Sequence, residues 1–227
     1  MGRWGWRLFE SDRDLDFACS INDHLEINTD NWTHQLSHMI HQTDALAPAE
    51  ARQYYRTQEY TTQLKTEIVP WVRDKLNTDN LGDALFAKAR LKEASAKGKY
   101  MTIILGALMM RAGANIKPED IQHLRDVAPQ INCNETYTLP LFDQGFRSPG
   151  RAQFCAALDH YQPGVPRNFQ EPSCFQCGKV GVDIGRTPQK CGGCKVAWYC
   201  DRQCQVLHRR VHRPSCIAPE RREWANV

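Results

Sequence analysis

The sequence has no long hydrophobic run. Its longest apolar stretch, Tyr100 to Met110, is about half of the roughly 20 residues that a membrane-spanning helix needs. The opening MGRWGWRLFE has no apolar stretch after its basic side chains, so we expect no signal peptide. Strand-like alternation and internal repeats at solenoid periods are also missing. We therefore expect a mainly α-helical protein that is intracellular, in the nucleus or cytoplasm, without a membrane partner.

The signatures of common enzyme classes are missing too. No glycine-rich phosphate-binding loop and no serine nucleophile elbow occurs. His34, His38 and His41 have the spacing of one helix face, but no glutamate lies between them as in metalloprotease helices. A polar helix face is the better interpretation of these histidines. We expect no enzyme activity, and the alternative is an activity of the helical part that no motif reveals.

Cysteine, in contrast, is abundant and clustered. Seven of the ten cysteines lie between residues 174 and 216, where pairs of donors are separated by two or three residues. The eight candidate zinc ligands are Cys174, Cys177, Cys191, Cys194, Cys200, Cys204, His212 and Cys216. Eight thiolate or imidazole donors suit two closed tetrahedral sites, which are structural rather than catalytic. We therefore expect two Zn²⁺ per chain as cofactors, although spacing alone does not decide which four donors share an ion.

Before this cluster, the apolar residues have the three-and-four spacing of amphipathic helices. Helices are expected at about 15–21, 33–43, 49–76 with a kink at Pro70, 81–94 ending before Gly98, 100–112, 118–127 and 151–161. Residues 162–173 contain three prolines and lack periodicity, which is typical of a linker. The predicted organisation is a helical domain (1–161), a proline-rich linker (162–173), a zinc-stabilised module (174–216) and a tail (217–227).

The cysteine-rich segment resembles the MYND-type zinc finger. The resemblance rests on its two Cys-x2-Cys pairs, on Trp198-Tyr199-Cys200, on Cys204-Gln205 and on the final His-x3-Cys. It implies a two-site cross-brace with a short helix at about 201–211. The first zinc would then be held by Cys174, Cys177, Cys200 and Cys204, and the second by Cys191, Cys194, His212 and Cys216. The family spacing also favours His212 over His208, which lies one helical turn earlier. The first 16 residues resemble the opening of a small helical domain of unknown function, which implies no activity.

MYND modules generally bind other proteins, and several accept short proline-containing peptides. Gln205 matches a polar position of the motif, whereas Arg209 stands where the family usually has tryptophan. The loss of that aromatic anchor favours general protein binding over binding of a proline motif. The resemblance thus implies an interaction adaptor, in transcriptional or signalling regulation, whose partner is a peptide segment of another protein.

The alternative partner is nucleic acid, which would bind the basic face of the module. That face includes Arg202, Arg209, Arg210 and Arg213. It is less favoured because the thiolates that bind zinc reduce the positive charge of the segment, and because few aromatic residues are available to stack on bases.

Overall fold

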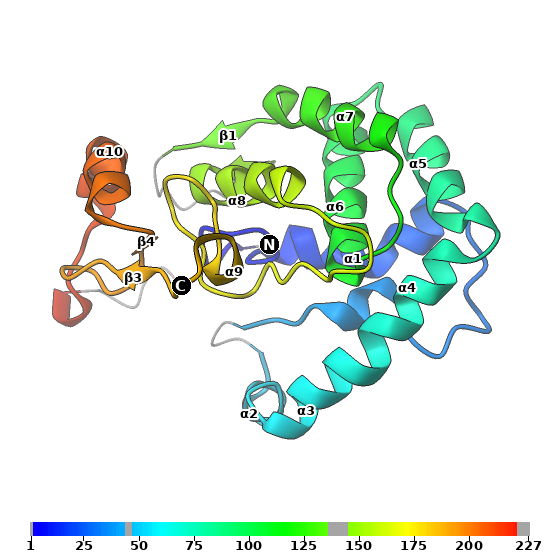
Figure 1. Cartoon of the computed structure of the whole chain (residues 1–227), viewed down its shortest axis with the longest axis horizontal. Helices are drawn as coiled ribbons and strands as arrows, with labels where there is room; N and C mark the ends of the chain where they lie inside the picture. The colour runs from blue at the N-terminus through cyan, green and yellow to red at the C-terminus, as the bar shows by residue number, and fades with distance from the viewer. Residues whose placement is uncertain (1, 44–46, 136–144, 222–227) are drawn as a thin grey trace.

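The computed structural model describes residues 2–43, 47–135 and 145–221. Its helices are α1 (Asp12–His24), α2 (Ala49–Tyr54), α3 (Gln58–Gln63), α4 (Val69–Asn77), α5 (Leu81–Leu91), α6 (Ala96–Ala112), α7 (Pro118–Val127), α8 (Ser148–Asp159), α9 (Gly181–Ile184) and α10 (Arg202–His212). The strands have two residues each: β1 (Cys133–Asn134) pairs in parallel with β2 (Phe146–Arg147), and β3 (Gln189–Lys190) pairs antiparallel with β4 (Trp198–Tyr199). The predicted mainly α-helical class is confirmed (Figure 1). None of the described helices is long and apolar enough to cross a bilayer.

Helix α6 forms the centre of the helical body, with α1, α4, α5 and α7 packed around it (Figure 1). Every residue from Tyr100 to Ala112 is buried, as expected for a segment that is apolar on all sides. Gly106 has a specific role, because a Cβ atom at this position would lie 2.6 Å from a methyl carbon of Leu124 on α7. The glycine therefore permits the close approach of α6 and α7.

The helix predicted over 33–43 is wrong. Only Leu36–Met39 forms a short 3₁₀ turn, and the backbone is extended again at Ile40. This turn already buries Leu36 and Met39 in the core, so a longer helix is not needed to satisfy the apolar pattern. The rings of His34 and His38 stay close, at 6.1 Å between centroids, but the His41 ring packs on another element. The three histidines therefore do not line one helix face.

The helix predicted over 49–76 is divided into separate pieces. The Thr57 hydroxyl accepts a hydrogen bond from the Tyr60 amide and so begins α3 after a break. Further on, Pro70 has no N–H to donate, and the preceding residues Leu64–Ile68 are π-helical. The wider turn lets the chain continue through the proline into α4.

The expected break at Gly98 is also misplaced, because this glycine lies in the first turn of α6. Its amide donates to Oγ of Ser95, which caps the helix. A Cβ at residue 98 would lie 1.7 Å from the carbonyl oxygen of Lys92, so glycine allows the chain to reverse tightly between α5 and α6.

The segment 162–173, expected to be a linker, lies against the helical body. Phe169 is 1% exposed and belongs to the main hydrophobic core. The Arg167 amide donates to the carbonyl oxygen of Met110 at 2.8 Å, and Nε2 of Gln153 donates to that of Phe169, also at 2.8 Å. The segment thus connects the two parts of the chain through fixed contacts, while the domain boundaries themselves stay a prediction.

The cysteine-rich segment contacts the helical body directly. The Trp6 and Phe175 rings lie 6.2 Å apart, which joins the N-terminal segment to the small core of the cysteine-rich part. Gly178 has a left-handed φ of 75°, and a Cβ there would lie 1.9 Å from the carbonyl oxygen of Ala152 on α8. Glycine at 178 therefore permits both the local turn and the close contact with α8.

Candidate metal centre

The eight donors identified in the sequence lie in two groups of four. One group is Cys174, Cys177, Cys200 and Cys204, and the other is Cys191, Cys194, His212 and Cys216. Within each group the ligand atoms all lie within 4.8 Å of one another. No third cluster of this kind occurs in the described part of the chain. The arrangement is the interleaved one, in which the first and third pairs share a site.

The spacing of the donor atoms fits zinc and excludes disulfides. The Sγ atoms of Cys177 and Cys200 lie 3.4 Å apart, and those of Cys191 and Cys216 lie 3.7 Å apart. A disulfide would bring the sulfurs to about 2.05 Å, whereas a tetrahedral zinc with Zn–S bonds of about 2.3 Å separates them by about 3.8 Å. None of the ten cysteines forms a disulfide. Each group therefore suits one Zn²⁺ with four protein donors.

The β3–β4 hairpin and helix α10 explain why the two sites interleave. In the hairpin, Lys190 pairs with Trp198, so Cys191 and Cys200 follow directly after the paired strands. These two cysteines belong to different groups. Helix α10 is shared in the same way, because its first turn carries Cys204 and its last residue is His212. Each element thus supplies ligands to both sites.

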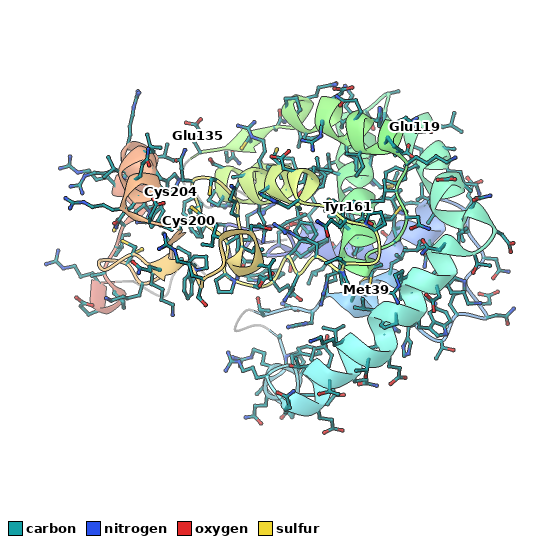
Figure 2. All side chains as sticks on the ribbon, in the orientation of Figure 1. Met39, Glu119, Glu135, Tyr161, Cys200 and Cys204 are labelled. Atoms are coloured by element: carbon teal, nitrogen blue, oxygen red, sulfur yellow. The ribbon has the colours of Figure 1, made fainter. Side chains whose placement is uncertain are left out.

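The start of α10 is fixed by a side-chain cap. The Asp201 carboxylate accepts a hydrogen bond of 2.8 Å from the amide of Cys204. An aspartate at this position is a favoured N-cap and also suits the positive end of the helix dipole. The cap holds Cys204 beside Cys200, as Figure 2 shows at the base of α10. The helix predicted at about 201–211 is therefore present.

The electrostatics of the group of four cysteines favour a bound cation. Burial and the neighbouring thiols Cys177 and Cys174 raise the pKa of Cys200 well above its ordinary value. Burial also acts to raise the pKa of Cys174, but backbone hydrogen bonds from Cys177, Cys200 and Gln176 outweigh it and lower that pKa. Four thiols whose sulfur atoms lie within 4.8 Å of one another cannot all lose their protons unless a positive charge balances them. A divalent ion supplies the missing positive charge and deprotonates the remaining thiols.

The structure separates the two candidate histidines. Nε2 of His212 lies 3.5 Å from Sγ of Cys194, inside the second group. His208 is instead buried behind the site, where its Nδ1 is 3.0 Å from the hydroxyl of Tyr199. Burial, together with the charge of His212, lowers the pKa of His208 to about 4, which keeps this ring neutral. His208 is therefore a core residue of the module.

The two residues proposed to contact a partner have different surroundings. Gln205 is half-buried, and its Nε2 lies 3.9 Å from Sγ of Cys191, so its amide supports a zinc ligand. The sequence motif did not indicate this contact, which depends on how α10 packs on the hairpin. Arg209 is exposed on the outer side of α10. Their contacts with a partner stay a prediction.

Residues 174–216 match the family model of the MYND finger. Comparisons with curated proteins and with solved structures give no significant match. Because all four positions around each ion are filled by side chains, zinc would supply structural cross-linking and leaves no place for a reacting water. The ligand spacing, the two interleaved groups and the family match together identify residues 174–216 as a MYND-type zinc finger with two zinc sites.

Proposed function

We propose that this protein is an adaptor whose MYND finger docks onto a peptide segment of another protein. MYND fingers are protein-interaction modules. The observation that carries the proposal is the outer face of α10, where the adjacent side chains Val206 and Leu207 are 60% and 62% exposed. Neither is needed for the zinc sites or for the small core of the module. Exposed apolar side chains surrounded by polar ones are typical of a binding surface.

The rim of this surface is basic. Arg209 and Arg210 are exposed next to the apolar pair, and Gln205 connects the same helix to the second zinc site. A partner segment with apolar side chains would bury Val206 and Leu207, while the arginines would contact its polar atoms. Because Arg209 replaces a large aromatic anchor, the proposal does not depend on a proline motif.

The test is a cross-linking capture with the zinc-loaded full chain, followed by identification of the partner and a direct affinity measurement. We expect Val206→Ser/Leu207→Ser to weaken the affinity at least tenfold without loss of zinc. The matched control is Val182→Ser on α9, where the valine is 79% exposed. Equal binding by the α10 variant and the wild type would reject this face as the docking surface.

We also propose where the protein is located in the cell and that its role is not catalytic. Seven clustered thiols can serve as ligands only while reduced, so we place the protein inside the cell, in the nucleus or cytoplasm. Docking would serve transcriptional or signalling regulation. The adaptor role involves no catalysis, and the helical body is proposed to present the finger.

Nucleic-acid binding is the second candidate. Arg202, Arg209, Arg210 and Arg213 are all exposed on α10 or directly after it. Binding to phosphates through these residues would be micromolar or weaker for random duplex DNA and would fall steeply with added salt. The apolar pair on the same face favours a protein. A salt titration with random duplex DNA distinguishes the two kinds of partner. Salt-sensitive binding that is lost in Arg209→Ala/Arg210→Ala would favour nucleic acid.

A further inference from the structure

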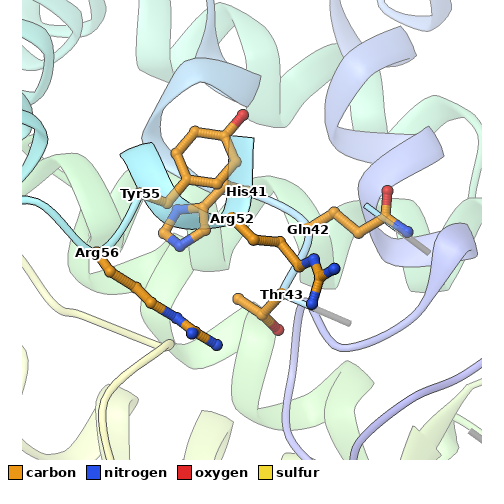
Figure 3. Close-up of a pocket in the computed structure, with 6 residues that line it drawn as sticks. All are labelled: His41, Gln42, Thr43, Arg52, Tyr55 and Arg56. Atoms are coloured by element: carbon orange, nitrogen blue, oxygen red, sulfur yellow. The ribbon is translucent and has the colours of Figure 1, made fainter. Parts of the chain in front are cut away.

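A recess on the helical body lies away from the zinc finger and has no role in the function proposed above. It is lined by His41, Gln42, Thr43, Arg52, Tyr55 and Arg56, and it has a volume of about 60 Å³ (Figure 3). On this measure one water molecule needs about 10–15 Å³, so the recess has room for a small polar group rather than for a drug-sized ligand.

The aromatic side of the recess is held in a fixed position. The His41 and Tyr55 rings pack with their centroids 4.3 Å apart, and Nδ1 of His41 lies 3.2 Å from the hydroxyl of Tyr60. The His41 carbonyl oxygen accepts a hydrogen bond of 2.7 Å from Nε2 of Gln170. These contacts hold both the backbone and the side chain of His41 in place, so this side of the recess is formed before any ligand binds.

Two arginines and the hydroxyl group of Thr43 also line the recess. Figure 3 shows the guanidinium groups of Arg52 and Arg56 on either side of Thr43. Nε of Arg52 donates to the carbonyl oxygen of Ala47 at 3.0 Å, which fixes the orientation of its guanidinium. Nε1 of Trp4 donates to Oγ1 of Thr43 at 3.1 Å. Because this bond uses the oxygen as acceptor, the hydroxyl hydrogen is available to donate into the recess.

Two of the side chains that line the recess, Arg52 and Arg56, carry a positive charge. None of the described residues that line the recess is acidic. Arg52 and Arg56 are four positions apart, so their like charges repel. Arg111, whose charge also acts on His41, is buried and donates from its Nε to the carbonyl oxygen of Met39. It has an acidic neighbour in Glu171, and it does not line the recess. An anion between the two outer arginines would relieve this repulsion and accept hydrogen bonds from both.

We propose that this recess binds a phosphate group, with Arg52, Arg56 and Thr43 as its donors. A phosphate monoester presents three terminal oxygens, one for each of these three donor groups. Guanidinium groups bind such oxygens with paired, charge-assisted hydrogen bonds. The small volume limits the ligand to the phosphate itself, with any attached group outside. The bound phosphate group would come either from free phosphate or from a phosphorylated side chain, because both present the same oxygens.

The test is calorimetric titration of the zinc-loaded full chain with inorganic phosphate at constant ionic strength. We expect saturable binding of one phosphate per chain, weakened at least tenfold in Arg56→Ala. This variant should keep its fold, since the Arg56 side chain is exposed. Thr43→Val should weaken binding several-fold. The matched control, Arg209→Ala/Arg210→Ala, removes two exposed charges from the finger and should bind phosphate as the wild type does.

Two further arms identify the ligand. O-phosphoserine that binds at least tenfold more tightly than inorganic phosphate assigns the recess to a phosphorylated side chain, whereas equal binding assigns it to the free anion. Asp44, which lies outside the described residues, is the nearest carboxylate in sequence. Binding that is absent in the wild type and present in Asp44→Asn would overturn the proposal, because the chain would then fill its own recess. Unsaturable binding, or binding unchanged in Arg56→Ala, would overturn it as well.

Discussion

Arg167 and Asp183 form a paired ion bridge between the segment 162–173 and the zinc finger. Nη1 of Arg167 lies 2.6 Å from Oδ1 of Asp183, and the second nitrogen reaches the second oxygen. The two side chains are only 8% and 3% exposed. Asp183 also accepts a hydrogen bond from the amide of Val180 at 2.9 Å. This one carboxylate therefore closes the start of α9 and attaches the finger to the helical body.

Removal of that carboxylate should destabilise the whole chain. Burial acts to raise the pKa of Asp183, but the hydrogen bonds from Arg167 and Val180 outweigh it and lower that pKa. The charged form is thus favoured in the folded state, and its contribution is lost as the pH falls through the folded pKa. We expect Asp183→Asn to lower the free energy of unfolding by about 3 kcal/mol in urea at neutral pH, because the buried Arg167 charge loses its partner.

The control for this prediction is the exposed pair of Arg125 and Asp159, whose side chains are 37% and 58% exposed. Asp159→Asn should change the free energy of unfolding by less than about 1 kcal/mol, since exposed pairs contribute little. Similar effects of the two substitutions would show that the Arg167–Asp183 bridge is not the attachment that we describe.

The interleaved ligand pairing can be tested by zinc content. Cys174 and Cys200 share a site in the structure, whereas Cys174 and Cys194 belong to different sites. The double variant Cys174→Ser/Cys200→Ser should therefore retain about one zinc per chain, against about two in the wild type. Cys174→Ser/Cys194→Ser should retain almost none. Elemental analysis of the purified variants distinguishes the two arrangements, because sequential pairing predicts the opposite result.

A pair of glycines tests the packing of the finger on α8. Gly178 and Gly185 both have left-handed φ angles, of 75° and 67°. A Cβ at 178 would lie 1.9 Å from the carbonyl oxygen of Ala152, whereas nothing lies within 4 Å of a Cβ at 185. Gly185→Ala should lower the free energy of unfolding by about 1 kcal/mol through backbone strain alone. Gly178→Ala should have a clearly larger effect, and equal urea midpoints would contradict the close contact.

His41 should make the chain sensitive to mild acid. Burial, and to a smaller extent the charge of Arg111, lowers the pKa of His41 from 6.5 to about 4. The neutral ring is favoured in the folded state, so its contribution is complete above pH 6.5 and is lost as the pH falls toward 4. The difference amounts to about 3 kcal/mol at most. Imidazole titration by NMR and the pH dependence of unfolding in His41→Gln measure it; an ordinary pKa near 6.5 would refute the prediction.

Sequence patterns were most informative where local chemistry leaves few solutions. Helix α7 begins at Pro118, with Glu119 and Asp120 in its first turn, and ends at Val127, as predicted. The uniformly apolar segment of α6 had to be buried on every side. Patterns failed where a local interaction competes with the helix. Near residue 38, the His38 ring nitrogen accepts from the Gln35 amide and closes a 3₁₀ turn, so apolar spacing alone did not fix the length of the element.

The sequence by itself determined the chemistry of the zinc finger, because eight soft donors in short pairs have one stable outcome in a segment too small to build its own core. Only the tertiary structure decided which donors share an ion, since that depends on the pairing of β3 with β4 and the packing of α10. It also decided that residues 162–173 are held in place rather than free. The prolines of this segment predict only that it does not form a helix. They do not predict the burial of Phe169 or the Arg167–Asp183 bridge, which depend on contacts with residues distant in the chain.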